Sequence, residues 1–346
     1  MRAVLLRGRG PQGVTVDEAT EPGLMPGRVR LRMLAASVNR VDLYMRDSGE
    51  GITHTLPQIM GVDGVGLALD AGPGIAPGDL CIIYPYEFCG SCPHCLAGDQ
   101  PLCLNARILG EHRDGTFAEV VSVPAASVLR LQPGVDIAGA ATLGVGWLTA
   151  WRMVFGKVTL QPGSTVLVQG AGGGVAQAAA LLARMGGARV IVTTSGAAKI
   201  DHFRATGFEV IDHAAGPVSR AVLDLTDGAG ADLVIDNVGA ATWGQSLRSA
   251  RRGGAIVTCG ATTGGAPSAD LQRLFVRQLS IHGSTMGSLT EFRRLIDCFE
   301  AGRIVPQIDC ILPLDRTVEA LARAEDPARL GKVVLKIAPW PGEETK

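Results

Sequence analysis

Residues 166–195 read VLVQGAGGGVAQAAALLARMGGARVIVTTS, and this stretch decides the fold. A short apolar run, Val166–Gln169, precedes a cluster of glycines, and a longer segment of small and apolar residues, Val175–Met185, follows it. A second β-branched run then ends at Thr194. Short apolar runs bounded by glycines predict strands, and the longer segment between them predicts a helix. The stretch is therefore predicted to fold as strand, tight turn, helix and strand.

The glycine-rich turn has the pattern of a dinucleotide-binding site. Glycines let the backbone turn sharply and approach a pyrophosphate, whose negative charge then lies at the free N–H groups of the helix N-terminus. Ala176 takes the third glycine position, where a small residue is enough for helix and strand to pack closely. The alternative, a flexible loop in a chain with 46 glycines, is disfavoured by the strands on both sides. The predicted cofactor contacts at this turn are Gly170, Gly172, Gly173, Gly174, Val175 and Ala176.

The end of the second strand indicates which dinucleotide binds. A bare ribose 2′-hydroxyl is usually held by an Asp or Glu at this position, whereas this chain has Thr193, Thr194 and Ser195, with Lys199 in the next helix. Hydroxyls and a lysine suit a 2′-phosphate, which a carboxylate would repel. We therefore predict NADP(H), with NAD(H) as the alternative. Thr194, Ser195 and Lys199 are the predicted contacts, and a solvated surface residue is the alternative for Lys199.

The composition fits a soluble protein of two domains. The chain has 346 residues, 47% of them hydrophobic and 19% charged, which is too long for one compact core of ordinary size. A net charge of −1 gives no reason to expect nucleic acid or an anionic membrane as a partner. The apolar run near the N-terminus is too short for a signal peptide, and no stretch approaches the length of a membrane span. We expect a cytoplasmic protein.

Four of the eight cysteines, Cys89, Cys92, Cys95 and Cys103, lie close together. The spacing C-x2-C-x2-C-x7-C can close around one tetrahedral metal ion, and four sulfur ligands leave no vacancy for a substrate. In a long, cytosolic chain such a cluster favours metal over disulfides. We therefore predict one structural zinc ion. An iron–sulfur cluster is the alternative, which the wide last gap and the lack of a Cys-Pro pair disfavour.

The pattern of elements changes along the chain. Residues 1–146 are predicted to form short strands separated by Gly and Pro turns, as in a barrel or sandwich, and the alternating Val29, Leu31 and Met33 indicate one of these strands. From about Trp147 strands and helices alternate, which predicts a parallel, doubly wound α/β sheet. The tail from about Ser288 adds a helix, another helix at Thr317–Ala324 and a strand at Lys332–Lys336. The strands expected in the α/β part are Val166–Gln169, Val190–Thr194, Leu233–Asp236, Ile256–Cys259 and Ser280–Gly283, and the expected helices are Ala197–Ala205, Val218–Leu225, Thr242–Arg251 and Asp270–Arg277.

The order of these parts resembles the medium-chain dehydrogenase/reductase superfamily over nearly the whole chain. Besides the glycine turn, supporting motifs are GPGIAPGD at 72–79, DGTFAEVVSVP at 114–124, IDNVG at 235–239 and GKVVLK at 331–336.

The resemblance implies a Rossmann dinucleotide-binding domain at 147–285 and a GroES-like catalytic domain formed by 1–146 and 286–346, with a zinc lobe at about 86–106. It places the catalytic cleft between the two domains. It also implies cofactor contacts at Asn237 and Thr149, and a homodimer formed through edge strands near Leu279–Gly283.

Departures from the superfamily pattern concern the catalytic metal. Zinc alcohol dehydrogenases hold it with a Cys, a His and a further Cys or Asp, and the matching positions here are Asn39, Val62 and Val145, with Asp63 after Val62. Valine has no donor atom and asparagine is a poor zinc ligand, so a catalytic zinc is not expected. Val41 likewise replaces the hydroxyl that relays the alcohol proton. Both the Lewis acid and the proton relay are therefore expected to be missing.

Asn39, Asp42, Tyr44 and Arg46 instead resemble the N-x-x-D-x-Y-x-R pattern of quinone oxidoreductases and enoyl reductases. Those enzymes pass hydride from the nicotinamide to an activated C=C bond or a quinone, and hydrogen-bond donors meet the developing enolate. The resemblance implies Asn39 and Tyr44 as donors, Tyr44 or water as the proton source, and Asp63 as a residue that orients the site. The alternatives are a packing role for Tyr44 and structural pairing for Asp42 and Arg46.

We therefore predict an NADPH-dependent reductase of α,β-unsaturated carbonyls or quinones, with a small hydrophobic conjugated substrate and no catalytic metal. One alternative is a zinc-type alcohol dehydrogenase or carbonyl reductase with displaced ligands, which would bind two metal ions and respond to chelators. Another is a non-catalytic NADP(H)-binding protein, which would bind the cofactor without turnover. The pocket residues do not determine the substrate.

Overall fold

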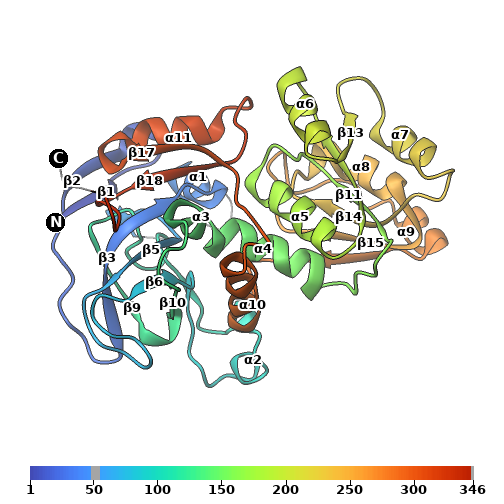
Figure 1. Cartoon of the computed structure of the whole chain (residues 1–346). Coiled ribbons are helices and arrows are strands. Elements are labelled where there is room, and N and C mark those ends of the chain that lie inside the picture. The colour runs from blue at the N-terminus through green and yellow to red at the C-terminus, as the bar shows by residue number, and fades with distance from the viewer. Residues whose placement is uncertain (48–54, 344–346) are drawn as a thin grey trace. The chain divides into compact units, whose positions relative to one another are not determined.

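The computed structural model of the chain describes residues 1–47 and 55–343 (Figure 1). The chain divides into two compact units: the first comprises Met1–Leu148 and Ser288–Lys346, and the second comprises Thr149–Gly287. Both the N-terminal and the C-terminal segments therefore belong to the first unit, and each unit has a hydrophobic core of its own. No helix within these described ranges is long and apolar enough to cross a membrane.

The second unit is built on a parallel sheet whose strand order, among the described residues, is β13-β12-β11-β14-β15-β16. In this sheet β11 comes first in the sequence. β12 and β13 follow on one side of it, and β14, β15 and β16 follow on the other side. Because the order reverses between β11 and β14, the predicted doubly wound α/β sheet is confirmed. The strands are β11 (Thr165–Val168), β12 (Arg189–Thr194), β13 (Glu209–Asp212), β14 (Ala231–Asp236), β15 (Ala250–Thr258) and β16 (Ser280–Gly283).

Helices connect these strands and cover the sheet (Figure 1). Trp243 and Leu247 of α8 belong to one buried cluster with Val234 and Ile256 of the sheet. Central strands of a parallel sheet are covered on both faces, so they are apolar runs, and this is why such runs predicted them. The helices of this unit are α5 (Gly174–Met185), α6 (Ala197–Ala205), α7 (Val218–Leu225), α8 (Ala240–Ser249) and α9 (Leu271–Arg277), and α4 (Leu148–Trp151) begins at the boundary.

Among the described residues after 146, two strands have no counterpart among the predicted ones. β13 has four residues, begins and ends with an acidic residue, and lies at the edge of its sheet beside β12. β17 (Ile308–Pro313) is also an edge strand and pairs in parallel with β18. An edge strand has an exposed side, so polar residues interrupt the apolar run that would reveal it. By contrast, α6, α7 and β16 have the predicted bounds.

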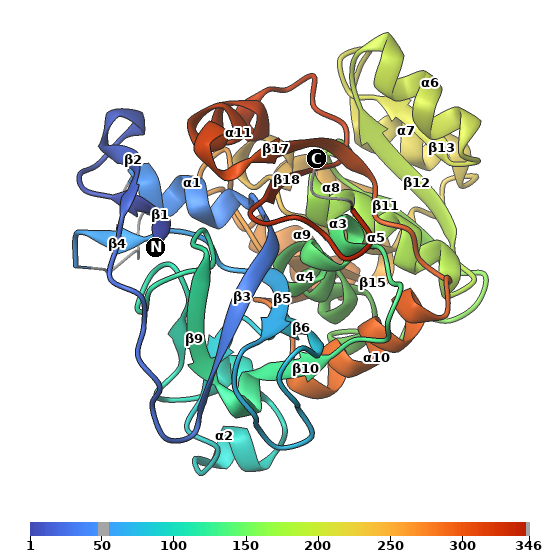
Figure 2. The same cartoon turned by 60° about the vertical axis from the view of Figure 1, so that its left-hand side comes forward.

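The first unit contains a larger sheet with the order β10-β6-β5-β3-β18-β17, in which β9 also pairs with β3. β18, from the C-terminal segment, pairs antiparallel with β3 (Figure 2). In this pairing Val334 lies opposite Ser37. The C-terminal segment therefore completes the sheet of the N-terminal segment. The strands of this sheet are β3 (Arg28–Ser37), β5 (Gly64–Ala68), β6 (Leu80–Ile83), β9 (Val120–Pro124), β10 (Val128–Arg130), β17 and β18 (Lys332–Lys336), and the smaller sheets contain β1 (Arg2–Leu6), β2 (Val14–Glu18), β4 (Gln58–Ile59), β7 (Tyr86–Glu87) and β8 (Arg107–Ile108).

Alternation along β3 determines which face of the larger sheet is buried. Val29, Leu31 and Met33 are fully buried in the core, whereas Arg30 forms an ion pair with Asp70 at 2.9 Å. This period of two is the pattern that predicted the strand. The helices of this unit are α1 (Arg40–Asp47), α2 (Pro93–Leu96), α3 (Ile137–Ala141), α10 (Leu289–Glu300) and α11 (Thr317–Glu325).

Candidate functional site

The glycine turn lies between β11 and α5 and is held by a residue of β12. Gly170 has a φ of +67°, a backbone conformation that favours glycine, and a Cβ placed there would lie 3.1 Å from the Val238 side chain. The Gly170 N–H donates to Thr193 Oγ1 at 2.9 Å, and that hydroxyl donates to Gln169 Oε1 at 3.0 Å. Thr193, which lies beside the predicted contact Thr194, therefore orders the turn.

The start of α5 presents free backbone donors. The first N–H that bonds back within the helix belongs to Gln177, which donates to the Gly173 carbonyl at 2.9 Å. Among the described residues, no side chain caps this N-terminus. Gly172, Gly173, Gly174 and Val175 are half-buried, while Ala176 is fully buried, as expected of the position where helix and strand pack together. This arrangement fits the pyrophosphate of a dinucleotide.

The other residues predicted to contact the cofactor lie in different environments. Thr194, the last residue of β12, is buried, and Ser195 and Lys199 are half-buried. Asn237 follows β14, and its Oδ1 is buried without a hydrogen-bond partner, so it is an acceptor available to a ligand. Thr149 is buried and donates its hydroxyl hydrogen to Met286 Sδ at 3.9 Å.

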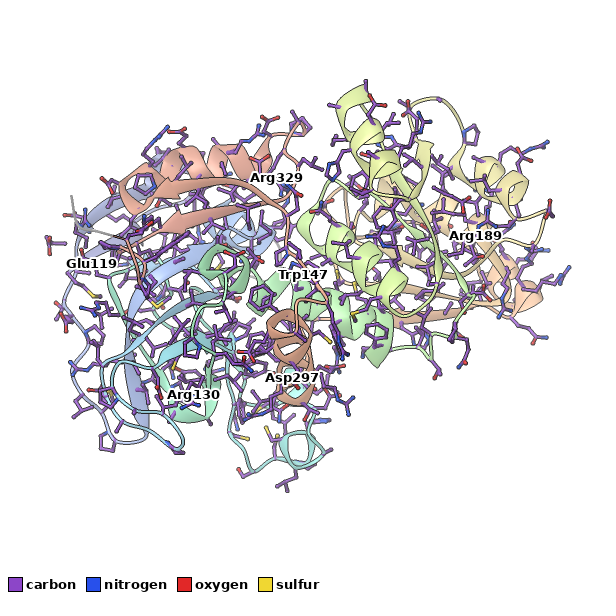
Figure 3. All side chains as sticks on the ribbon, in the orientation of Figure 1. Glu119, Arg130, Trp147, Arg189, Asp297 and Arg329 are labelled. Carbon is purple, nitrogen blue, oxygen red and sulfur yellow. The ribbon has the colours of Figure 1, made fainter. Side chains whose placement is uncertain are left out.

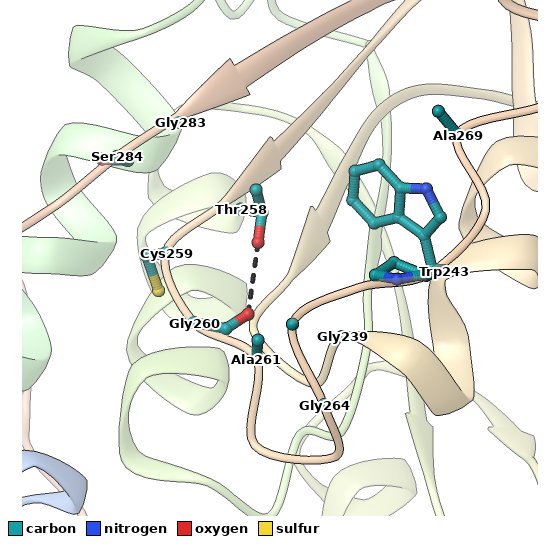
Figure 4. A pocket seen from close by; sticks show the side chains of 12 residues that line it. Gly239, Trp243, Thr258, Cys259, Gly260, Ala261, Gly264, Ala269, Gly283 and Ser284 are labelled. Atoms are coloured by element: carbon teal, nitrogen blue, oxygen red, sulfur yellow. Dashed lines mark hydrogen bonds between the residues drawn. The ribbon is translucent and has the colours of Figure 1, made fainter. Parts of the chain in front are cut away.

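A cavity of about 480 Å³ lies at the carboxyl ends of β15 and β16 (Figure 4). Trp243 forms one wall, and Thr258 donates to the Gly260 carbonyl at 3.3 Å inside the lining. Burial raises the pKa of the lining Cys259 thiol to about 12, so that thiol is neutral at pH 7. Ser284 adds a hydroxyl oxygen that is buried without a partner. Sequence reasoning missed this cavity, although the glycine-rich stretch after β15 was a signal for it.

The four-cysteine lobe is arranged for a metal ion. The Sγ atoms of Cys89, Cys92, Cys95 and Cys103 all lie within 4.8 Å of one another, and Cys89 Sγ is 3.9 Å from Cys95 Sγ and 3.6 Å from Cys103 Sγ. Sulfur ligands of a tetrahedral zinc ion lie about 3.8 Å apart, because each Zn–S bond is about 2.3 Å. The backbone N–H of Cys92 also donates to Cys89 Sγ at 3.3 Å. The cluster therefore fits a zinc lobe.

The positions that match catalytic zinc ligands carry a hydrogen-bonded cluster instead. Across residues 1–47 and 55–343, no other group of three or more His, Cys, Asp and Glu side chains brings its ligand atoms together. Val62 is fully buried, and Val145 lies in the helical segment Leu143–Trp147, whose last residue Figure 3 labels. The Val145 backbone N–H donates to Asp63 Oδ2 at 3.2 Å.

Asp63 is the centre of this cluster. It is fully buried and accepts four hydrogen bonds, from Ser37 N at 3.3 Å, Ser37 Oγ at 2.9 Å, Asn39 Nδ2 at 3.0 Å and the Val145 N–H. Burial raises the pKa of Asp63, and the Lys332 ammonium and the hydrogen bonds oppose that rise. The predicted orienting residue is therefore enclosed by protein donors.

Asn39 is also engaged inside the protein. Its Nδ2 donates to the Ser37 carbonyl at 3.0 Å and to Asp63, and its Oδ1 accepts from Lys332 Nζ at 2.6 Å. Its backbone N–H donates to Asp42 Oδ2 at 2.7 Å. An Asn39 amide that donates to a substrate would have to break one of these internal hydrogen bonds. Sequence reasoning did not identify Lys332, which lies 293 residues away from Asn39 in the chain.

The remaining members of the sequence motif lie on α1. Tyr44 is half-buried, and the Arg40 guanidinium lies 5.7 Å from the centre of its ring. Arg46 is buried and forms ion pairs with Asp47 at 2.6 Å and with Glu325 of α11 at 2.9 Å. Arg46 therefore has a structural role, which was the alternative given for it. Its partners are Asp47 and Glu325, and not Asp42. Asp42 is fully buried, and burial raises the pKa of its carboxyl to about 7.

Known proteins match both units of the chain. Residues 25–133 match the alcohol dehydrogenase GroES-like domain, and residues 174–301 match the zinc-binding dehydrogenase family. A zinc-type alcohol dehydrogenase-like protein of Schizosaccharomyces pombe is 31% identical over 325 residues, which is 91% of this chain and 92% of that protein. A solved NAD-dependent alcohol dehydrogenase is 37% identical with a TM-score of 0.92, covering 98% of this chain and 100% of that one. An acryloyl-coenzyme A reductase of Metallosphaera sedula is 27% identical over 97% of this chain and 99% of its own.

These matches establish the class of the protein. The chain belongs to the medium-chain dehydrogenase/reductase family, in its zinc-type alcohol dehydrogenase-like group. It is accordingly an oxidoreductase with a GroES-like domain and a Rossmann-like parallel sheet, and the cysteine lobe matches the zinc-binding character of its family.

Proposed function

We propose that this protein is an NADPH-dependent reductase of activated C=C bonds, in α,β-unsaturated carbonyls or quinones, that works without a catalytic metal. One observation carries the proposal: the positions that match catalytic zinc ligands hold Asn39, Val62 and Val145, and the polar atoms there are satisfied by Asp63 and Lys332. The resemblance to an acryloyl-coenzyme A reductase over almost the whole chain supports it.

A conjugated acceptor suits this site because it needs little Lewis-acid help. When bound, the dinucleotide would supply the hydride. Addition of that hydride to the β-carbon of the acceptor would move the electron pair of the C=C bond toward the carbonyl oxygen and give an enolate. The enolate spreads its charge, so a hydrogen-bond donor can stabilise it. Tyr44 carries the hydroxyl that the sequence motif assigns to this role, and both amide hydrogens of Asn39 are already donated inside the protein. Protonation of the α-carbon, by Tyr44 or by water, completes the reduction.

The N-terminus of α5 would hold the pyrophosphate of the cofactor, with Asn237 as a further contact. Ser195 and Lys199 would contact the ribose 2′-phosphate beyond the end of β12. Thr194 at that strand end has no carboxylate that would repel the phosphate. With the adenosine half placed toward β12, the nicotinamide half would extend toward β14, β15 and the cavity beside Trp243. A solved zinc-binding dehydrogenase relative of Sinorhizobium meliloti is bound to NADP, while other relatives are named NAD-dependent.

The cysteine lobe would hold one structural zinc ion.

The chain would form a homodimer. β16 is the open edge of its sheet, and α9, which precedes β16 in the chain, has no buried residue among those described. Leu271 and Phe275 of α9 are 67% and 68% exposed, and Ile281 of β16 is 38% exposed. Antiparallel pairing of β16 with the same strand of a second copy would bury these side chains and remove the open edge.

A second candidate is alcohol oxidation or carbonyl reduction, which the names of several relatives favour. Consumption of NADPH with an unsaturated ketone and with its saturated counterpart separates the candidates, using chelator-washed protein whose zinc is counted. Turnover with the unsaturated ketone alone and one zinc per chain is the expected result. Turnover with the saturated ketone would overturn the proposal, and NADPH binding without turnover would identify a non-catalytic protein.

A further inference from the structure

The Asn39 amide lies between a buried cation and a buried anion. Lys332 is the first residue of β18 and is 5% exposed, and its Nζ donates to Asn39 Oδ1 at 2.6 Å and to the Val38 carbonyl at 2.7 Å. At the other end of the amide, Asn39 Nδ2 donates to the fully buried Asp63 carboxylate at 3.0 Å. Within the described residues, Lys332 forms no direct ion pair, so the amide links it to its counter-charge.

This arrangement allows one orientation of the amide. If the Asn39 amide were flipped, its NH2 group would face the Lys332 ammonium and its oxygen would face the Asp63 carboxylate. Both contacts would be repulsive, and the low polarity of a buried site strengthens such repulsion. The two charges therefore hold the amide in place from both sides.

The same cluster joins four segments of the first unit. Asp63, which lies between β4 and β5, bonds to Ser37 at the end of β3 and to the helical segment that contains Val145, and Lys332 adds β18. The Asn39 backbone N–H donates to Asp42, so the cluster also holds the start of α1, the helix that carries Tyr44. A tetrahedral metal ion joins segments in the same way, through ligands from each of them.

We propose that Lys332 is a positioning residue: together with Asp63 it clamps the Asn39 amide, and this clamp holds the segment 37–44 where zinc dehydrogenases would use a catalytic metal. Lys332 acts through Asn39 and does not touch the substrate. The catalytic consequence, a fixed position for Tyr44, rests on the proposed function, whereas the clamp itself does not.

Isotope labelling can test the clamp without any assay of activity. The chain has three asparagines, Asn39, Asn105 and Asn237, so protein labelled with 15N-asparagine gives three side-chain NH2 pairs, and the Asn39→Ser variant identifies one of them. In the wild-type protein we expect the Asn39 pair to exchange with deuterium at least about a hundredfold more slowly than an exposed amide. Lys332→Met should shift that pair and speed its exchange, and the matched control Lys336→Met, at the other end of β18, should not.

Kinetics then test the positioning role. At a temperature where the variant is fully folded, Lys332→Met should lower kcat for the unsaturated ketone by about tenfold to a hundredfold and leave the KM for NADPH unchanged, because a small misplacement of a reacting group is costly. If Lys332→Met does not fold, the test uses Asp63→Asn and the double variant that combines Asp63→Asn with Lys332→Met. We expect Asp63→Asn to lower the thermal midpoint, and the double variant to recover about half of that decrease, because it leaves no uncompensated ammonium buried.

Three results are decisive. Fast exchange of the Asn39 amide in the wild-type protein, or an Asn39 pair unchanged in Lys332→Met, would overturn the clamp. A clamp that is present while kcat is unchanged in Lys332→Met would overturn the positioning role. Failure of the wild-type protein to reduce any unsaturated ketone would remove the proposed function and leave the result on the clamp standing.

Discussion

Replacement of Asp42 by asparagine should remove a large pH dependence of stability. Asp42 is fully buried, its Oδ2 accepts a hydrogen bond from Asn39, and its Oδ1 has no partner. Burial raises the pKa of this carboxyl from 3.8 to about 7. A carboxyl whose pKa is higher in the folded state binds its proton more tightly there. Its contribution to stability is therefore lost as the pH rises from about 4 to about 7.

The magnitude follows from these two pKa values. Relative to Asp42→Asn, the wild-type protein should lose about 2.5 kcal/mol of unfolding free energy between pH 5 and pH 7.5, because one pKa unit corresponds to about 1.36 kcal/mol. Carboxyls whose pKa is lowered by ion pairs, such as Asp70 and Asp309, change stability at lower pH and cancel in the comparison. Asparagine keeps the shape and the acceptor of Asp42, so the variant is expected to fold.

Urea unfolding at several pH values measures this effect. The control is Asp47→Asn, an exposed position on the same helix, which should displace the curve by a constant amount. If the wild-type and Asp42→Asn curves run parallel between pH 5 and pH 7.5, Asp42 is ionised in the folded protein and the reasoning is refuted.

Four further predictions concern the metal, the cofactor, the proton donor and the interface. Cys95→Ser should reduce the zinc content from one ion per chain to none and lower the thermal midpoint by roughly 10 °C, measured by metal analysis and calorimetry; retained zinc would contradict it. Ser195→Asp should raise the KM for NADPH about tenfold and leave that for NADH nearly unchanged, since the new carboxylate repels a 2′-phosphate; equal effects on both would count against the cofactor assignment. Tyr44→Phe should lower kcat about a hundredfold if its hydroxyl is the donor, and an unchanged rate would leave water as the proton source. Ile281→Lys should convert the dimer to monomer in light scattering, whereas Val305→Lys, at a 73% exposed position of the first unit, should not.

Much of the fold could be predicted from local patterns in the sequence. The glycine turn, the period of two along β3 and the alternation of strands and helices after residue 147 arise from contacts between residues close in the chain, so short windows contain them. The four cysteines also lie in a short span, and their spacing alone indicated a tetrahedral site, to which their sulfur atoms conform.

Interactions between distant segments were decided by the tertiary structure. Nothing near Lys332 in the sequence shows that it meets Asn39, because that contact depends on the pairing of β18 with β3. The same holds for Arg46, whose partner Glu325 lies 279 residues away. The edge strands β13 and β17 form mainly because each pairs with a neighbouring strand, and their own residues contribute less.

Asn39 shows the difference most clearly. From its sequence motif it was predicted to donate to a substrate, since a motif shows which groups a side chain carries but not where they point. In the folded protein a buried cation and a buried anion lie at opposite ends of its amide, and both of its hydrogens are donated within the protein. Local sequence patterns were enough to predict the fold class and the sulfur ligands, and the family resemblance showed that three positions lack metal-binding side chains. The direction of each hydrogen bond depended on which charges the tertiary structure buried together, because buried polar groups orient toward the partners that enclose them.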